Sequence, residues 1–281
     1  MTLTDFFPIR TDKVLTHGGK FHSDDVFGAA LLRIVQPDVS IHRVFAVPED
    51  FDGLAFDIGH GAFDHHQPDA RVRENGEKYA AFGLLWEVLG AQLLGEEDAA
   101  SFDEHFIQPL DRSDNTGEPH PLADAVDAFN PTWDSGDDRD GAFFRAVDFA
   151  QGILEREFAR IRARQRADEL VRADLAASDG VVVVLSQYAP WTHVLIQSEA
   201  LFAVYPSIRG GYNAQVIPIS AEDRTARMDF PAEWAGKVDA ELKQISGISD
   251  LRFCHVGRFL IASETLEGAV AACRQTIAQA K

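Results

Sequence analysis

The sequence contains little cysteine and no long apolar run. Its two cysteines, Cys254 and Cys273, stand near the C-terminus without CxxC or zinc-ribbon spacing, which excludes a cysteine-rich zinc module or a disulfide scaffold. Two free thiols in a reducing compartment are expected, with a single disulfide as the alternative. No stretch approaches roughly 18 apolar residues, and the N-terminal MTLTDFFPIRTDKV has no basic segment followed by an apolar one. We therefore expect a cytoplasmic protein that does not span a membrane.

Basic residues are also scarce, because 26 lysines and arginines stand against 45 aspartates and glutamates, a formal net charge of −19. Such a chain is poorly suited to broad capture of long duplex DNA, which depends on many Lys and Arg contacts to phosphates. A short phosphate ester remains compatible, since acids that hold divalent cations present positive charge to the substrate. The motifs GxSxG, HExxH and the Walker loop are absent as well, so no covalent serine chemistry is indicated.

The stretch Phe56–Gln67, FDIGHGAFDHHQ, concentrates carboxylate and imidazole groups. An apolar strand is predicted to end at Asp57, and the glycines that follow allow a sharp turn. After this turn come Asp64, His65 and His66, whose side chains are ligands suited to Mn, Fe or Zn. The alternative interpretation is that the adjacent histidines only cap a loop.

A second segment of this kind lies near the N-terminus. A buried strand over 13–16 delivers His17, and the loop that follows carries His22 and Asp24. An apolar helix is predicted over 26–35, with one residue of Ser-Asp-Asp as its N-cap. Loops of this type lie beyond the carboxyl ends of strands, where ligands bind in open α/β sheets. The alternative is that the histidines are polar loop residues and the acids only complement the helix dipole.

A third segment follows a predicted helix over 102–110. Asp111 and Asp114 are three residues apart, so on a helix they would share a face, although they could equally be loop acids without a special role. The combined set suits a two-metal site, in which ions ~3.5–4 Å apart share a bridging carboxylate, and Asp57 is the natural bridge. The candidate ligands are His17, His22, Asp24, Asp57, Asp64, His65, His66, Asp111 and Asp114.

The composition divides the chain into three parts. We predict an α/β domain over 1–140 with a parallel sheet flanked by helices, a connecting helix over 141–178, and a smaller α+β domain over 179–281. Residues 120–140 are expected to form an irregular loop. The expected strands are 13–16, 41–45, 54–58, 181–185, 193–196, 201–205 and 212–218, and the expected helices are 26–35, 78–89, 102–110, 142–175 and 265–280.

The last part of the chain offers two candidate substrate contacts. Arg209 stands beside Gly210 and Gly211 just before a predicted strand, where glycine amides can approach an anion closely and arginine adds a forked donor. An ordinary tight turn is the alternative there. His255 and Arg258 form a second polar pair between strand-like runs.

Five stretches together resemble one known family. THGGKFHSDDVFGAALL, FDIGHGAFDHHQ, LDRSDN, GGYNAQVIPIS and SGISDLRFCHVGRFLIA, in this order, look like the melanocyte proliferating gene family of the DHH phosphoesterase superfamily. The resemblance covers nearly the whole chain and implies a DHH-type metal-binding catalytic domain followed by the DHH-associated C-terminal domain. One departure is that the first motif reads THGGKFHSDD where family members are closer to THNGTFHCDE, which leaves the charge of the site open.

Carried over by position, the resemblance implies roles for individual residues. His17, His22 and Asp24 match the first metal motif, with His22 where many superfamily members have Asp. Asp57 matches the bridging aspartate, and His65 matches a metal ligand.

The remaining motifs leave some alternatives open. His66 is a ligand or a substrate contact, either Asp111 or Asp114 fills the fourth motif, with Asp111 preferred, and the Gly-Gly region resembles the substrate-binding part of the C-terminal domain. The expected catalytic residues are Asp57, His65 and His66, and the expected substrate contacts are His66, Arg209, Gly210, Gly211, His255 and Arg258.

The resemblance implies a Mn-dependent phosphodiesterase of the 3′–5′ exonuclease type. We expect two Mn²⁺ ions, with Mg, Fe or Zn as alternatives, an activated water as nucleophile, and short RNA or small nucleotides as substrates. A non-catalytic regulatory protein that binds metal or nucleotide is the rival from another class, and a small-molecule phosphatase is a third reading. A homodimer is left open by the sequence.

Overall fold

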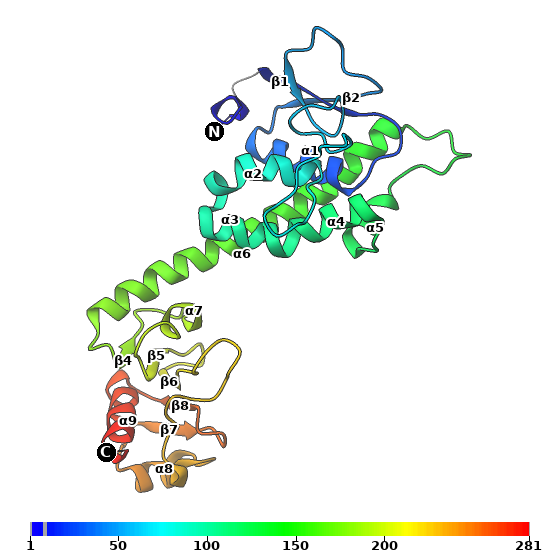
Figure 1. Cartoon of the computed structure of the whole chain (residues 1–281). Helices are drawn as coiled ribbons and strands as arrows, with labels where there is room; N and C mark the ends of the chain where they lie inside the picture. Colours follow the sequence, from blue (N-terminus) through cyan, green and yellow to red (C-terminus); the bar gives the residue numbers. More distant parts are fainter. Residues whose placement is uncertain (1, 8–9, 281) are drawn as a thin grey trace. The chain divides into compact units, whose positions relative to one another are not determined.

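Figure 1 shows the chain as a computed structural model that describes residues 2–7 and 10–280. The chain divides into two compact units, residues 1–162 and 163–281, and each contains its own sheet. The division falls inside the longest helix, α6 (Arg139–Ala177). The structure is a mixed α/β protein with a parallel sheet and several helices, which confirms the predicted fold class at that level.

The sheet of the first unit has three parallel strands. β1 (Arg10–His17) lies between β2 (Ser40–Val44) and β3 (Gly53–Ala55). In the register of β1 and β2, His17 stands beside Val44. Because parallel strands all point the same way, residues that follow β1 and β3 emerge at one edge of the sheet.

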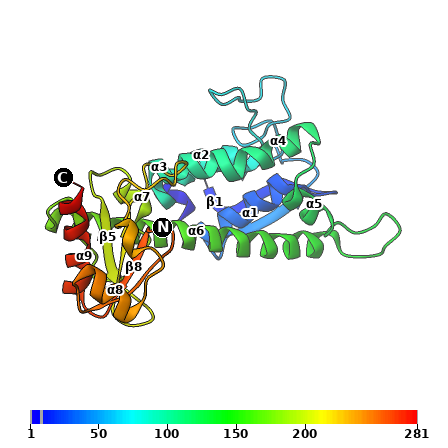
Figure 2. The same ribbon diagram turned by 90° about the horizontal axis from the view of Figure 1, so that it is seen from below.

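The helices of the first unit pack their apolar faces against one core. In Figure 2, α1 lies between α2 and the first part of α6. Contacts agree with this view, since the rings of Phe27 and Phe82 are 5.5 Å apart and Arg33 on α1 pairs with Asp148 on α6 at 2.7 Å. The helical segments, in order, are a 3₁₀ turn (Leu3–Asp5), α1 (Ser23–Val35), α2 (Ala81–Leu94), α3 (Glu96–Phe102), a π-helical turn (Asp103–Ile107), α4 (Gln108–Thr116), α5 (Pro121–Asp127) and α6.

Three predictions for this unit were wrong in detail. The N-cap of α1 is His22, because Asp25 at the third helical position accepts the backbone N–H of His22 at 2.9 Å, as in a capping box. α2 begins later than expected, after an extended Ala80. The predicted irregular loop 120–140 contains α5, whose first turn has proline at an N-terminal position and the His120 side chain as acceptor.

The second unit is built on a five-stranded mixed sheet. The strand order is β4-β5-β6-β8-β7, with β4 and β5 parallel and the other pairs antiparallel. Its elements are β4 (Val182–Val184), α7 (Thr192–Leu195), β5 (Phe202–Pro206), β6 (Tyr212–Val216), a 3₁₀ turn (Ala232–Trp234), α8 (Asp239–Ser246), β7 (Leu251–Cys254), β8 (Leu260–Ser263) and α9 (Leu266–Gln279).

One predicted strand of this unit is wrong. The run His193–Ile196 falls on the short helix α7 (Thr192–Leu195) and its C-cap Ile196, and Leu195 N–H donates to the carbonyl of Trp191 at 3.0 Å. A short apolar run fits a buried strand and a buried helical turn equally well, so the pattern could not separate them. Within residues 2–7 and 10–280, none of the helices combines the length and the apolar character that crossing a membrane requires.

Candidate metal centre

The site forms where the chain leaves the parallel sheet. Asp57 follows β3 with φ of +55°, a left-handed conformation that costs most non-glycine residues ~1–3 kcal/mol. Its N–H donates to the carbonyl of Phe63 at 2.9 Å, and Phe56 pairs with Phe63 in an isolated bridge. The turn between them therefore folds back on β3 and places Asp64, His65 and His66 beside Asp57.

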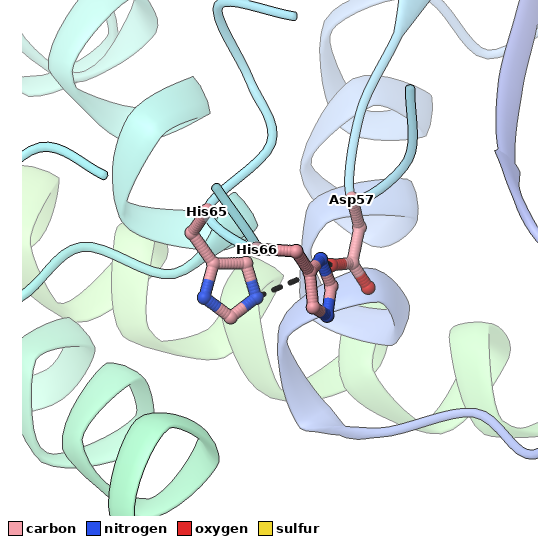
Figure 3. A group of neighbouring side chains, drawn as sticks. All are labelled: Asp57, His65 and His66. Carbon is pink, nitrogen blue, oxygen red and sulfur yellow. Dashed lines mark ion pairs between the residues drawn. The ribbon is translucent and has the colours of Figure 1, made fainter. Parts of the chain in front are cut away.

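Asp57 is the shared member of the cluster, and its carboxylate is almost completely buried. Its Oδ2 lies 3.2 Å from Nε2 of His17, at the end of β1. Its Oδ1 lies 3.2 Å from Nε2 of His65 and 3.6 Å from Nδ1 of His66. Figure 3 shows the rings of His65 and His66 converging on this carboxylate. The two oxygens of Asp57 thus face different imidazoles.

Two further acids, one on α1 and one on α4, approach the imidazole of His65. Asp24, in the first turn of α1, places Oδ2 3.3 Å from Nε2 of His65. Asp114, on α4, places Oδ2 3.4 Å from the same nitrogen. Asp24 and Asp114 also form a compact group with His22, in which one potential ligand atom from each lies within 4.8 Å of the others.

Asp25 belongs to the site although its sequence position alone did not suggest a ligand. Its Oδ2 lies 3.0 Å from Nε2 of His17. His17, Asp25 and Asp57 form a second compact group of this kind, and Asp57, His65 and His66 form a third. The signal that could have found it is the capping box of α1, which turns Asp25 back toward His22 and the end of β1.

In the metal-free protein, bound protons offset the negative charge of the clustered carboxylates. Burial disfavours the charged form of His17 and of His65, but the surrounding carboxylates outweigh it and raise the pKa of each to about 11. Burial raises the pKa of Asp25 to about 7, and burial beside Asp24 raises that of Asp114 to about 9. The pKa of Asp24 is lowered, because its contact with His65 outweighs its burial.

Several polar atoms of the site are buried without a hydrogen bond to any of residues 2–7 and 10–280. They are Oδ1 of Asp24, Oδ2 of Asp25, Oδ1 of Asp57 and Nε2 of His65. Buried polar groups normally have partners, so carboxylate oxygens left unpaired around imidazole nitrogens form a site that could hold a cation. Carboxylate oxygens and imidazole nitrogens fit Mn²⁺, Fe²⁺ or Zn²⁺.

Asp111, the preferred fourth-motif ligand from the sequence, belongs to none of the compact groups of potential ligands and pairs with Arg73. Its Oδ2 accepts from Nη2 of Arg73 at 2.8 Å, and burial raises its pKa to about 7 in spite of that arginine. The structure brings Asp114, three residues on, against His65 and Asp24. We therefore favour Asp114 over Asp111 as the ligand from α4.

Asp64 holds His66 in place. Its Oδ1 lies 2.7 Å from Nδ1 of His66 and 3.1 Å from the backbone N of the same residue, while Oδ2 accepts from the backbone N–H of His60 at 2.6 Å. Asp64 is absent from the three compact groups. These contacts indicate that Asp64 stabilises the turn that follows Asp57.

A cavity of about 560 Å³ opens beside the cluster. Its lining includes four residues of the cluster, His22, His65, His66 and Asp114. The rest of the lining includes Glu118, Asp124 and Asp127, with no lysine or arginine among the described lining residues. The lining is therefore rich in carboxylates, of which Asp127 pairs with Lys20 at 2.8 Å.

The proposed substrate contacts of the second unit do not come together. Gly211, with φ of +70°, immediately precedes β6, whose first residue Tyr212 pairs with Ser263 of β8. A Cβ at Gly211 would meet the Ser263 carbonyl at 2.2 Å. Arg209 and Gly210 precede it in the exposed β5–β6 turn. His255 and Arg258 lie in the β7–β8 turn, at the other end of β8, where Arg258 pairs with Asp229 at 2.6 Å. A single anion cannot bridge the two turns, since all of β8 lies between them.

The sequence profile of the MYG1 exonuclease family, described as an uncharacterised protein family (UPF0160), matches residues 13–277. The chain is 29% identical to the MYG1 exonuclease of Homo sapiens, across 95% of this chain and 86% of that protein. It is 24% identical to the MYG1 protein of Schizosaccharomyces pombe, across 94% of this chain and 97% of the relative. The MYG1 protein of Dictyostelium discoideum is also 24% identical, across 95% and 96% of the two chains. No solved structure matches the chain.

Proposed function

The chain belongs to the MYG1 exonuclease family (UPF0160), and from this we propose that it is a manganese-dependent hydrolase of phosphodiester bonds in short RNA or small nucleotides. The carboxylate of Asp57 is the observation that supports the proposal most. Oδ2 lies 3.2 Å from Nε2 of His17, and Oδ1 lies 3.2 Å from Nε2 of His65. A carboxylate that offers one oxygen to each of two imidazoles is suited to bridge two divalent cations.

The ligands divide into two sets that share this carboxylate. His17, Asp25 and Asp57 would hold one cation. Asp57, His65 and the acids Asp24 and Asp114 would hold the other, with His22 beside them on the cavity side. When bound, such cations lower the pKa of a coordinated water and neutralise charge on the phosphoryl oxygens.

His66 has a different role from His65 in this proposal. Its Nδ1 is engaged by Asp64 at 2.7 Å, and its side chain is 55% exposed at the cavity. The ring edge that carries Nε2 is therefore the part left to meet a substrate. A half-exposed imidazole held by a carboxylate can bind a phosphoryl oxygen or supply a proton to the leaving oxygen.

The acidic cavity favours a small substrate. Glu118 and Asp124 would repel additional phosphates of a long strand, and the net charge of −19 adds to that repulsion. The phosphate that reacts would be held by the cations. Short oligonucleotides and dinucleotides meet this condition better than long RNA.

The proposal is tested by combining metal analysis with turnover. Purified protein is dialysed against chelator and reloaded with Mn²⁺, Mg²⁺, Zn²⁺ or Fe²⁺. Hydrolysis of 5′-labelled oligoribonucleotides of two to ten residues is then followed. We expect about two Mn²⁺ per chain and shortening from the 3′ end. Asp57→Asn keeps the size of the side chain but removes its charge, and it should remove at least one metal and nearly all activity.

Matched variants separate the site from general effects. His42→Gln changes an exposed histidine of β2 that contacts Ser40, and it should leave both metal content and turnover unchanged. Asp114→Asn should reduce metal content, whereas Asp111→Asn should reduce stability more than metal content. Turnover of phosphate monoesters but not of dinucleotides would point to a small-molecule phosphatase. Metal binding without hydrolysis of any phosphate ester would favour a regulatory role and refute the proposal.

A further inference from the structure

Asn115 links three segments around the candidate metal centre. It follows Asp114 on α4, and its amide nitrogen Nδ2 donates to the carbonyl of Tyr79 at 3.1 Å and to that of Asp111 at 2.9 Å. Its Oδ1 lies 3.3 Å from Nδ1 of His65. Asn115 is therefore engaged at both ends of its side-chain amide.

The directions of these hydrogen bonds fix the orientation of the Asn115 side-chain amide. Carbonyl oxygens only accept, so the NH₂ group of Asn115 must face Tyr79 and Asp111. Its Oδ1, which also only accepts, is then the atom beside His65, and Nδ1 of His65 must carry a proton to make this bond.

A proton fixed on Nδ1 leaves Nε2 of the neutral imidazole with a lone pair. This nitrogen lies 3.2–3.4 Å from oxygens of Asp24, Asp57 and Asp114. A lone pair surrounded by three acceptor oxygens is the arrangement of a metal-ligand shell, where the ring nitrogen opposite the metal is held by an outer partner.

We propose that Asn115 is a positioning residue, which holds His65 as the Nδ1-protonated tautomer and turns its Nε2 lone pair toward a divalent cation. The inference rests on the metal site of the proposed function. His17 offers an internal parallel, because its Nδ1 lies 2.9 Å from the carbonyl of Gly18 while its Nε2 faces Asp25 and Asp57. At His17 the backbone carbonyl of Gly18 holds Nδ1, as the Asn115 side chain does at His65. Only the Asn115 contact can therefore be removed by a side-chain mutation.

The first test is the affinity for Mn²⁺ alone, measured by titration calorimetry on the full chain. Asn115→Ala should weaken binding by ~10–100-fold, the usual cost of losing an outer partner of a ligand. Asn75→Ala is the matched control, because Asn75 likewise uses its Nδ2 to hold α4, donating to the side chain of Gln108 at 2.9 Å, but it does not contact His65. It should change the affinity by less than ~3-fold, as expected away from the ligand shell.

A second measurement separates positioning from a general structural effect. In a His65→Ala background, Asn115→Ala should cause no further loss of Mn²⁺ affinity, because its effect acts through that ring. In the Zn²⁺-loaded protein, long-range ¹H–¹⁵N spectra should show His65 protonated at Nδ1, and should show a mixture of tautomers in Asn115→Ala.

The outcomes distinguish this inference from the proposed function. Wild-type protein that binds Mn²⁺ while Asn115→Ala binds it equally well would overturn the role of Asn115 and leave the hydrolase proposal standing. A further loss in the His65→Ala background, or Nε2 protonation of His65 with Zn²⁺ bound, would also overturn it. Wild-type protein that binds no divalent cation would refute the metal site itself and the inference with it.

Discussion

Gly83 is the position where a single methyl group tests the packing beneath the metal centre. It lies in the first turn of α2, and a Cβ there would come within 2.1 Å of Oδ2 of Asp111 and 2.5 Å of Nη2 of Arg73. Those atoms form a buried ion pair of 2.8 Å. Gly83→Ala must therefore push the pair apart, although alanine in place of glycine normally stabilises a helix.

The two effects can be weighed against each other. Alanine gains about 1 kcal/mol over glycine in a helix interior. Disrupting a buried ion pair costs about 3–5 kcal/mol, because each charge loses its partner without regaining water. The net expectation is a destabilisation of about 2–4 kcal/mol, which lowers the Tm by roughly 5–15 °C for a unit of this size.

Gly152→Ala is the matched control. Gly152 lies in the exposed part of α6, and a Cβ there would meet no atom within 4 Å. This variant should gain stability by up to about 1 kcal/mol. Urea unfolding of metal-free protein, followed by tryptophan fluorescence and circular dichroism, compares both variants with the wild type. A Gly83→Ala variant that is as stable as the wild type, or more stable, would refute the reasoning. It would mean that the Asp111–Arg73 ion pair accommodates the methyl group without loss of stability.

Four further predictions follow from the contacts and the burial of individual side chains. In metal-free protein the pKa values of His17 and His65 lie above their unfolded values, so their contribution to stability is complete below pH ~6.5 and is lost as the pH rises toward about 11. The urea midpoint of unfolding should therefore fall as the pH is raised from about 6 to about 10. A midpoint that stays constant over this range would contradict the prediction. Mn²⁺ binding should displace those protons, so its calorimetric heat should depend on the ionisation enthalpy of the buffer. Arg73→Met leaves Asp111 buried without its arginine and should cost about 3–5 kcal/mol in urea unfolding, of which Asp111→Asn in the same chain should restore a part. Both cysteines are buried, which raises the pKa of each thiol, so Ellman's reagent should react with two thiols in denaturant and with neither at a fast rate in the native protein.

The parallel sheet and the ends of its strands were predictable because they depend on local pattern. Apolar runs end at His17 and Asp57, and parallel strands carry their ends to one edge of a sheet. The imidazoles after the Gly-rich turn could be placed near that edge for the same reason. The long helix α6 was also predictable, because its apolar residues recur at helical spacing over many turns.

Other assignments depended on contacts that sequence spacing does not contain. Asp111 and Asp114 both lie on α4, and only the position of Arg73 shows that the first is taken up by an ion pair. The turns at Gly211 and His255 could be set at opposite ends of β8 only after the strand pairing was known.

The sequence by itself determined the family, the residue types of the site and the strands that carry them, because these follow from periodicity and from motifs read in order. The tertiary structure alone decided which carboxylate meets which imidazole, that Asp25 lies against His17, and that Asn115 lies beside His65. The physical reason is that ligand geometry and hydrogen-bond direction arise where segments distant in sequence pack together, and a rotation of α4 by one residue would exchange its partners.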